Sequence, residues 1–457
     1  MACCAPRKGV LIARAYRAAG AGDGSLRSIQ GIIRRYPGLA GQQDEEGRTL
    51  LHRCVEKGDL QGVNILLTAF PRGRWYDLQD YTGQTALHIA AIAGSPSIVK
   101  ALLRRGVDTT LQDVKGYCAI HYAAENTESS VPLLDTFLAH DVQSVLLETS
   151  RGSNPLMIVI SRGDVNAVRL LLGRVSQSFL HTPLVCEEAA SPERDTDPPR
   201  SSEAVAFSEL FQRRDHRQRT VFHLSAMLSS STIIRLLLEV SNETRFSYCG
   251  AGRLPIHYAC LSGCVKSVQL LAAIDPKLLS TADGGRTRGP ISYPLHYAVA
   301  SGSLPTVRYV LQSGGACTCN LHDQNQHTPL HSAVRQNVPD IVKALVHEGA
   351  DPNVTGIEGM TPTVLAASLG HAHIFFYLVR KGGDPLRPYK GSFTSLHMAV
   401  KNGHYELLET MLERGMAPKM TEAEHRQLVR LATRYQHLGI AKLLVSRIQR
   451  VFLEPPK

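Results

Sequence analysis

Aromatic residues and long hydrophobic runs are both scarce in this 457-residue sequence. Phe, Trp and Tyr together make up 6% of the residues, and Trp occurs once. Aromatic side chains supply much of the apolar area of large globular cores, so their scarcity argues against a single bulky core. No stretch approaches the roughly 18 consecutive apolar residues of a membrane-spanning helix. The composition therefore predicts small, uniform packing layers and no membrane span.

The ten cysteines lack the spacing of a zinc site or of a disulfide framework. The densest group is Cys317-Thr318-Cys319 followed by His322, which offers three ligands where structural zinc takes four. Thiols scattered through a long chain are typical of a reducing compartment. We therefore expect free cysteines, no metal and no other cofactor.

Catalytic motifs are missing as well. The sequence contains no recognisable catalytic triad, paired acid and base, Walker loop or His-Glu-x-x-His motif. The 19 histidines are the one feature that suggests chemistry, and eight of them fall in a repeated pattern described below. We predict that the protein is not an enzyme.

The stretch from His327 to Val354 shows what the sequence does contain. Thr328 can cap a helix with its hydroxyl group, and Pro329 fits the first helical turn, where no backbone donor is needed. A second apolar face begins at Val338 and stops at Gly349, the residue type best suited to a left-handed turn after a helix. The pattern predicts two short helices. Because isolated helices below about 12 to 15 residues are marginal in water, this unit requires neighbours.

The same opening recurs along the chain, which supplies those neighbours. We call the residue in the place of His331 the anchor. The anchors are His52, His88, His121, Met157, His223, His257, His296, His331, Val364 and His397. The differences between successive anchor numbers are 36, 33, 36, 66, 34, 39, 35, 33 and 33. A period of about 33 residues dominates, and the interval of 66 is two periods.

This period and the Thr-Pro-Leu-His opening resemble the ankyrin repeat family, in which each repeat is a turn followed by two helices. The resemblance implies an all-α repeat solenoid, an ankyrin-like stack of helix-turn-helix units joined by hairpin-like loops. It also implies that the anchor histidines are structural and bond within and between the loops. A solenoid grows by contacts between adjacent repeats, which agrees with the absence of a bulky core.

The anchors divide the chain into five segments. We expect an N-terminal segment and opening capping repeat at 1–47, ankyrin-like repeats at 48–176 and 217–425, and a C-terminal capping repeat and tail at 426–457, with Arg430 in the anchor place. The remaining segment, 177–216, is an insertion or a decayed repeat. Its piece from Ser191 to Ser202 is polar and contains three prolines, which favours a mobile loop over a distorted but packed repeat. Ser191 and Ser201 are candidate phosphorylation sites.

The chain is basic, with 50 Lys and Arg residues against 40 Asp and Glu residues. Pairs such as Arg104-Arg105 and Arg380-Lys381 fall at the ends of predicted second helices, where cations offset the helix dipole. The densest cluster is Arg213, Arg214, Arg217 and Arg219. This cluster keeps a nucleic acid or another anionic partner as an alternative.

The N-terminus carries one potential membrane signal. Cys3 and Cys4 stand beside Arg7 and Lys8, a setting in which cysteines can accept palmitate. Apart from this candidate palmitoylation we expect no membrane association. The expected state is a monomer in the cytoplasm, with the nucleus as a further location.

The most direct functional prediction is protein binding by a scaffold or adaptor, because stacked repeats form an extended concave surface. In the ankyrin family the residue after each anchor and the pair before the midpoint glycine face this groove. Early in the stack these places hold charged residues such as Arg53 and Glu56. The candidate partner-binding residues are Tyr122, Leu224, Met227, Leu228, Tyr258, Leu261, Tyr297, Arg335 and Gln336. An alternative is a substrate-recognition adaptor of a ubiquitin ligase, although the segment 446–457 is too short for a SOCS or F-box module.

Overall fold

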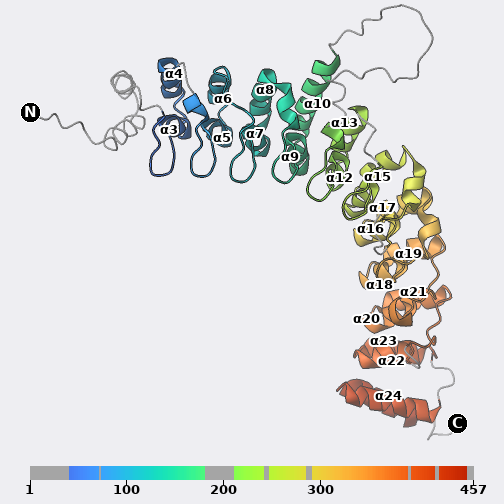
Figure 1. Ribbon diagram of the computed structural model, residues 1–457. Coiled ribbons are helices and arrows are strands. Elements are labelled where there is room, and N and C mark those ends of the chain that lie inside the picture. Colours follow the sequence, from blue (N-terminus) through green and yellow to red (C-terminus); the bar gives the residue numbers. More distant parts are fainter. Residues whose placement is uncertain are drawn as a thin grey trace, which may run out of the picture. The chain divides into compact units, whose positions relative to one another are not determined.

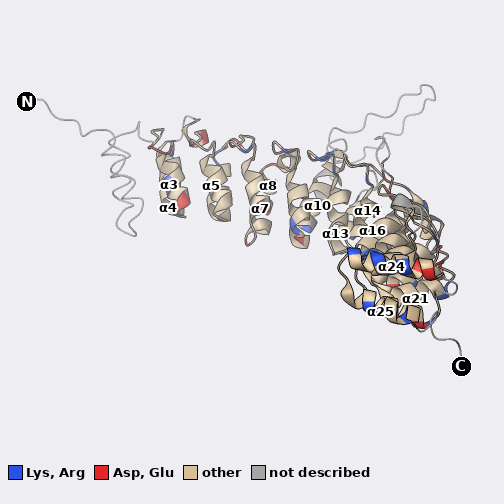
Figure 2. Cartoon of the chain, turned by 90° about the horizontal axis from the view of Figure 1, so that it is seen from below, with Lys and Arg blue, Asp and Glu red and all other residues tan. Residues whose placement is uncertain are grey.

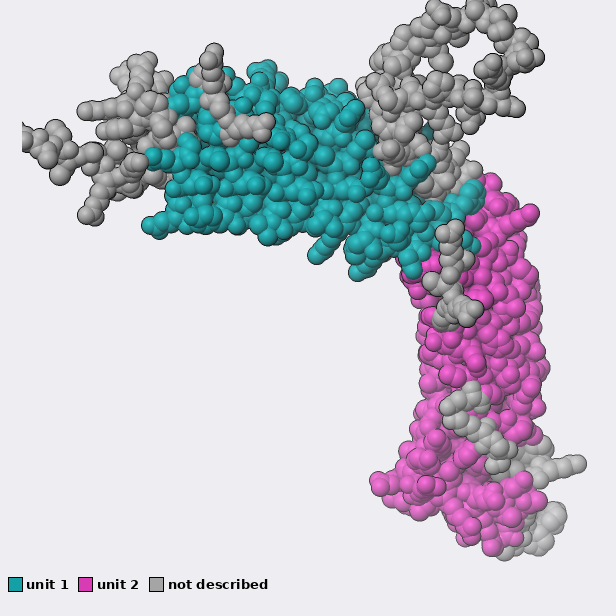
Figure 3. Space-filling view, viewed as in Figure 1, with its two compact units in different colours: residues 1–250 teal, residues 251–457 magenta. Residues whose placement is uncertain are grey.

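The computed structural model describes residues 41–70, 74–180, 210–240, 246–284, 291–389, 393–416 and 421–449. Regular structure in these ranges is helical, apart from one isolated antiparallel bridge between Tyr389 and Phe393. The chain forms two compact units, residues 1–250 and residues 251–457 (Figure 3). The predicted all-α repeat fold is confirmed.

Unit 1 contains helix pairs in two rows (Figure 1). Among the described residues, the first helices of its repeats are α3 (Leu50–Glu56), α5 (Ala86–Ile92), α7 (Ala119–Glu125), α9 (Pro155–Arg162) and α12 (Val221–Ala226). The second helices are α4 (Leu60–Ala69), α6 (Pro96–Leu103), α8 (Ser130–His140), α10 (Val165–Leu180) and α13 (Thr232–Val240). Two 3-10 helices, η2 (Arg74–Asp77) and η3 (Val142–Leu146), lie in the connections.

Unit 2 repeats the same plan. Its first helices are α14 (Pro255–Leu261), α16 (Pro294–Ala300), α18 (Pro329–Arg335), α20 (Pro362–Leu369), α22 (Ser395–Lys401) and α24 (Glu422–Arg434). Its second helices are α15 (Val265–Ala272), α17 (Leu304–Gln312), α19 (Pro339–His347), α21 (Ala372–Arg380), α23 (Tyr405–Glu413) and α25 (Leu438–Ile448). The connections hold η4 (Pro276–Ser280), η5 (Gly315–Thr318) and η6 (Ile357–Gly359).

Helix α18 shows why these residues form this element. Thr328 is its N-cap in an extended conformation, and Pro329 occupies the first helical position. The following second helix, α19, is succeeded by Gly349 at a φ of 95°, the left-handed region that glycine adopts without strain. With seven residues, α18 cannot be stable alone, and it is held by burial of Leu330, Ala333 and Val334.

Each unit has an apolar core between its helix rows. In unit 1 the residue before each anchor is buried in five successive first helices: Leu51, Leu87, Ile120, Leu156 and Phe222. In unit 2 the same position is buried as Ile256, Leu295, Leu330 and Leu396, with Thr363 also buried in α20. Leu330 therefore belongs to the apolar core of unit 2.

The last described repeat departs from the others at its start. Helix α24 has 13 residues against seven in α18. Its third residue, in the anchor place, is Glu424, whose carboxylate accepts the Thr421 N–H at 2.8 Å. Arg430, which the sequence spacing assigned to the anchor, lies further along the same helix and is exposed. The assignment was wrong because the Thr421–Glu424 capping box begins the helix early. Figure 2 shows charged residues along α24, as expected for a closing repeat.

Candidate protein-binding surface

The anchor histidines of unit 1 connect one repeat to the next. The Nδ1 atom of His52 accepts the backbone N–H of Thr49 at 3.1 Å, and its Nε2 lies 3.1 Å from the Gln84 carbonyl oxygen of the following repeat. A neutral ring that accepts on Nδ1 carries its proton on Nε2 and donates it to that carbonyl. His88 and His121 make the same two contacts. Nδ1 accepts the backbone N–H three residues earlier, and Nε2 lies beside a carbonyl oxygen of the next repeat. Burial lowers the pKa of His121 to about 4.

Unit 2 uses the same device. The Nε2 atoms of His257, His296 and His331 lie 3.1, 3.1 and 2.9 Å from backbone carbonyl oxygens of the following repeats. Burial lowers the pKa of His257 and of His331 to about 4. These imidazoles are neutral structural groups, as the family resemblance implied.

We call each hairpin loop between repeats a finger, and an aspartate closes several of them. In one finger of unit 1, Oδ1 of Asp113 accepts the N–H groups of Lys115 and Tyr117, each at 2.9 Å. Its Oδ2 accepts the hydroxyl group of Tyr122 at 2.6 Å. In unit 2, Asp283 accepts the hydroxyl group of Tyr297 at 2.5 Å. Burial and the bound carboxylate raise the pKa of both tyrosines. Finger and first helix are thereby joined by side chains.

The position directly after the anchor is largely covered by this arrangement. Leu224 is only 7% exposed and Tyr297 only 9% exposed, which leaves little of either side chain for contact with a partner. Tyr122 and Tyr258 are half-buried. For Tyr297 the physical reason is that its hydroxyl group donates to Asp283 in the finger that precedes its own helix.

One arginine approaches the rings of both Tyr258 and Tyr297. The Arg253 guanidinium carbon lies 5.8 Å from the Tyr258 ring centroid and 5.0 Å from the Tyr297 ring centroid. Cation–π contacts of this length are favourable. Arg253 was not among the residues singled out from the sequence, because its place four residues before the anchor gives no signal until the finger folds back.

The fourth residue after the anchor is the exposed one. In unit 1 this position is exposed as Glu56, Ile92, Glu125, Ser161 and Met227, and in unit 2 as Leu261, Ala300 and Arg335. Met227 is 46% exposed and Leu261 is 41% exposed. Leu228 is half-buried beside Met227, and Gln336 is exposed with its amide 3.3 Å from the Ala300 carbonyl oxygen. We call this row of first-helix ends the exposed stripe.

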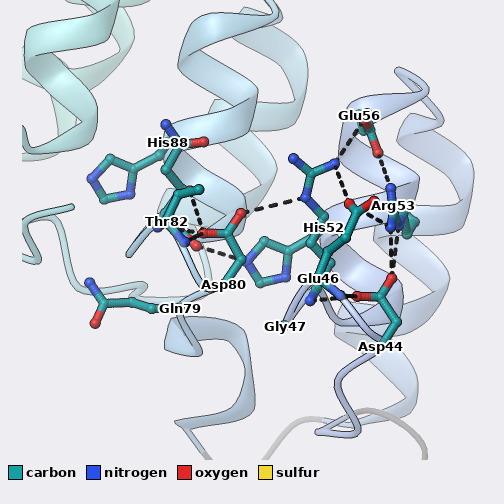
Figure 4. Close-up of polar contacts among 12 residues, drawn as sticks. Asp44, Glu46, Gly47, His52, Arg53, Glu56, Gln79, Asp80, Thr82 and His88 are labelled. Atoms are coloured by element: carbon teal, nitrogen blue, oxygen red, sulfur yellow. Dashed lines mark hydrogen bonds and ion pairs between the residues drawn. The ribbon is translucent and has the colours of Figure 1, made fainter. Parts of the chain in front are cut away.

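The charged beginning of the stripe is a network of ion pairs (Figure 4). Arg53 contacts Asp44 at 2.8 Å and Glu46 at 2.9 Å, and Arg48 contacts Glu56 at 2.9 Å. Arg48 also reaches the buried carboxylate of Asp80 in the next finger at 3.4 Å. Both arginines therefore form ion pairs with neighbouring carboxylates, and these pairs stabilise the fingers that hold Asp44 and Asp80.

Two fingers of unit 1 end in large exposed apolar side chains. Tyr81 is 73% exposed and Val114 is 78% exposed, at corresponding places in two successive fingers. The Tyr81 N–H donates to the Glu46 carbonyl, and the Val114 N–H donates to the Thr82 carbonyl at 3.1 Å. Beside Val114 lies a pocket of about 540 Å³ whose lining includes Tyr117, Tyr122 and Arg151. The backbone bonds hold neighbouring finger tips in register.

The arginine cluster from Arg213 to Arg219 is largely engaged in structural contacts. Arg213 pairs with Glu148 at 3.1 Å, Arg214 donates to the Tyr248 carbonyl at 2.8 Å, and Arg219 pairs with Asp215 at 2.7 Å. Arg217 is exposed. These contacts leave less free charge for an anionic partner than the sequence suggested.

Other sequence predictions meet the structure only in part. Cys3, Cys4, Ser191 and Ser201 lie outside the described residues, as do the opening repeat up to residue 40 and most of the segment 177–216. Within the described ranges no group of three His, Cys, Asp or Glu residues could hold a metal ion. None of the helices described is both long enough and apolar enough to span a bilayer.

Comparison with known proteins agrees with the fold. A family model of ankyrin repeats, in sets of three copies, matches residues 17–113, 51–143, 203–283, 277–356, 340–423 and 363–451. Ankyrin repeat protein nuc-2 of Neurospora crassa is 23% identical over 359 residues, which cover 76% of this chain and 26% of that protein. E3 ubiquitin-protein ligase KEG of Arabidopsis thaliana is 26% identical over 358 residues, which cover 69% of this chain and 20% of that protein.

Human B-cell lymphoma 3 protein is 32% identical over 139 residues, which cover 30% of each chain. The matched regions thus span less than a third of the length of each of these relatives. The family model, in contrast, covers well over half of this chain, and the structure has the helix pairs, fingers and anchor histidines to which it corresponds. The chain belongs to the ankyrin repeat family.

Proposed function

We propose that this protein is a non-catalytic scaffold or adaptor that binds a partner protein through the exposed stripe and finger tips of unit 1. The observation that carries the proposal is the exposure of Tyr81 and Val114 on successive fingers. Large apolar side chains held in a fixed spacing at the surface often mark a partner site. Aromatic residues are also enriched in the cores of protein interfaces.

The surroundings of these tips support a protein partner. Ile92, on the exposed stripe between the two fingers in sequence, is 46% exposed. The rings of Tyr117 and Tyr122 lie with their centroids 5.3 Å apart at the pocket beside Val114. An apolar side chain of a partner would find aromatic surface there, with Lys115 and Arg151 available for polar contacts at the margin.

The test is affinity purification with the double variant Tyr81→Ser and Val114→Ser. We expect circular dichroism and the melting temperature to stay unchanged, because both side chains are exposed. Capture of the partner should weaken at least tenfold, which corresponds to about 1.4 kcal/mol. The matched control is Tyr405→Ser, an exposed tyrosine on the second helix α23. Equal capture by the double variant and the wild type would exclude the finger tips as the binding site.

A second candidate is a substrate-recognition adaptor of a ubiquitin ligase. The observation that favours it is the similarity to a relative named as an E3 ubiquitin-protein ligase, of which this chain covers 20%. The same purification tests it, since ligase subunits should be captured along with the substrate. Their absence from a preparation that contains the partner would reject this candidate.

We also propose a monomer in the cytoplasm, with the nucleus as a further location. Light scattering of the purified chain and imaging of a tagged form would test these two proposals separately.

A further inference from the structure

The second helices of unit 2 border an open pocket that lies away from the exposed stripe. The pocket has a volume of about 640 Å³ and is lined by α19, α21 and the turn after α23, with no residue from a first helix. Figure 1 places α19 and α21 in the row of second helices. Val342, Ile374, Phe376 and Tyr377 line it with apolar and aromatic surface. The pocket is therefore separate from the surface assigned to the proposed function.

The polar lining of this pocket is cationic. Lys343, Arg380 and Arg414 contribute to it together with His373, and no Asp or Glu side chain does. Within the described part of the chain, neither Arg380 nor Arg414 forms an ion pair, whereas Lys343 contacts Asp340 at 3.0 Å. Two exposed guanidinium groups thus remain available for an anionic ligand.

Aromatic rings hold both arginines at the pocket. The Arg414 guanidinium carbon lies 4.2 Å from the Phe376 ring centroid, and that of Arg380 lies 5.8 Å from the Tyr377 ring centroid. Stacking on a ring restricts the guanidinium group without occupying its N–H donors in ion pairs. Less conformational entropy is then lost when a carboxylate binds in bidentate geometry.

The adjacent pocket shows that these properties do not follow from the repeat alone. Between α17 and α19 lies a pocket of about 370 Å³. Its lining contains the cations Arg308 and Lys343 but also the carboxylates Asp340 and Glu348, and it has no Phe, Tyr or Trp. Corresponding places in successive repeats therefore hold different pockets. The first contains both cations and carboxylates and no Phe, Tyr or Trp, whereas the second is cationic and aromatic.

We propose that the pocket between α19 and α21 binds an acidic peptide segment of a partner protein, with one bulky apolar side chain inserted between flanking carboxylates. Charge complementarity selects the acidic residues, because Arg380 and Arg414 lack carboxylate partners among the described residues. The apolar lining selects the inserted side chain, and the volume of about 640 Å³ lies in the range of sites that enclose a compact ligand. Arginine and aromatic residues are also the types that dominate binding energy in protein interfaces.

The probe for this proposal is a fluorescein-labelled peptide with one phenylalanine flanked on each side by three glutamates. Fluorescence anisotropy with the full chain should show saturable binding. A peptide with alanine in place of phenylalanine and a peptide with lysine in place of every glutamate should each bind at least tenfold more weakly. Failure of the wild-type chain to bind the first peptide, or equal binding of the alanine peptide, would overturn the proposal.

The variants locate the binding on the protein. Arg380→Ala combined with Arg414→Ala should weaken binding of the acidic peptide at least tenfold, whereas Arg308→Ala, in the adjacent pocket, should leave it unchanged. Both arginines are exposed, so the melting curve should be retained. The single variant Arg380→Glu provides a second test that keeps the Arg414 contact with Phe376. Unchanged binding by both the double variant and Arg380→Glu would place the peptide elsewhere and contradict the proposal.

Two further measurements distinguish this pocket from the finger tips and from a nucleic-acid site. The finger-tip variant Tyr81→Ser with Val114→Ser should bind the acidic peptide as the wild type does, so that failure here and failure of the proposed function are distinguishable. A 20-base-pair DNA duplex should bind more weakly than the peptide. Tighter binding of the duplex, lost in the double arginine variant, would identify a nucleic-acid site and reject the peptide.

Discussion

The repeats of α18 and α20, neighbours in unit 2, connect to the following repeat in two different ways. In α18, His331 accepts the Thr328 N–H on Nδ1, and its Nε2 lies 2.9 Å from the Met360 carbonyl oxygen of the next repeat. In α20, Val364 takes the anchor place and packs in an apolar cluster with Tyr389 and Met398. One junction is joined by a directional polar contact and the other by buried apolar surface.

The difference shows that the repeat architecture does not depend on one kind of contact. The imidazole must be neutral because its Nδ1 accepts the Thr328 N–H while its Nε2 donates to the carbonyl, and burial keeps it neutral by lowering the pKa of His331 to about 4. The apolar junction has no titrating group at its anchor, and Thr361 still caps the helix by accepting the Val364 N–H at 3.2 Å. Unit 1 contains the same pair of solutions, with His121 in α7 and Met157 in α9. The two junctions should therefore respond differently to acid.

The largest expected effect comes from the core that both kinds of repeat share. Leu330→Ala should lower the free energy of unfolding by about 2 to 5 kcal/mol, because it removes a fully buried side chain and leaves a cavity. Thermal melting followed by circular dichroism would measure it, with the half-buried Ser332→Ala as the control. An unchanged melting curve for Leu330→Ala would contradict the register of the repeats.

Acid should break the histidine junction selectively. The folded pKa of His331 is about 4 against a usual value of 6.5, so the unfolded chain binds more protons between these values. The free energy of unfolding then has its full value above about pH 7, and it falls as the pH decreases from 6.5 towards 4. Between pH 7 and pH 5 the loss is roughly 2 kcal/mol for such a histidine, since one pKa unit corresponds to about 1.4 kcal/mol.

The variant His331→Val tests this by giving α18 the anchor of α20. At pH 7 its free energy of unfolding should be lower than that of the wild type. Between pH 7 and pH 5, however, this free energy should fall by roughly 2 kcal/mol less than it does in the wild type. Denaturant unfolding at the two pH values measures both quantities. Identical pH dependence in the two chains would show that His331 does not titrate as its burial implies.

The smallest effect is expected at the apolar junction. Val364→Ala removes two buried carbon atoms and should cost about 1.5 kcal/mol, at roughly 0.8 kcal/mol for each buried methylene. Because no titrating group is changed, the cost should be the same at pH 7 and at pH 5. The same unfolding measurements apply, and a cost that varied strongly with pH would mean that the apolar cluster is coupled to the neighbouring histidines.

Much of the fold was accessible from the sequence because the signals are local. The Thr-Pro opening, the apolar spacing and the glycine at the end specify each helix pair, and α18, α19 and Gly349 lie where these signals predict. The start of α24 was missed because a second capping box, Thr421 with Glu424, competes with the periodic position.

The site was predicted less completely. Repeat position alone indicates that Met227, Leu261, Arg335 and Gln336 lie at the surface, and these four side chains are exposed. It does not indicate what covers them, and Tyr297 is buried through its bond to Asp283 in the preceding finger. Whether any of these residues binds a partner stays a prediction.

The sequence by itself determined the type of repeat, its period and the buried row of apolar side chains, because caps, turns and periodicity act over a few residues. Tertiary structure decided which side chains of neighbouring second helices meet. Arg414 follows α23 and reaches the ring of Phe376 in α21, and its distance of 4.2 Å depends on how these two second helices pack. Contacts between repeats arise from stacking geometry, which no local pattern encodes, and the cationic pocket between α19 and α21 exists only once the repeats are stacked.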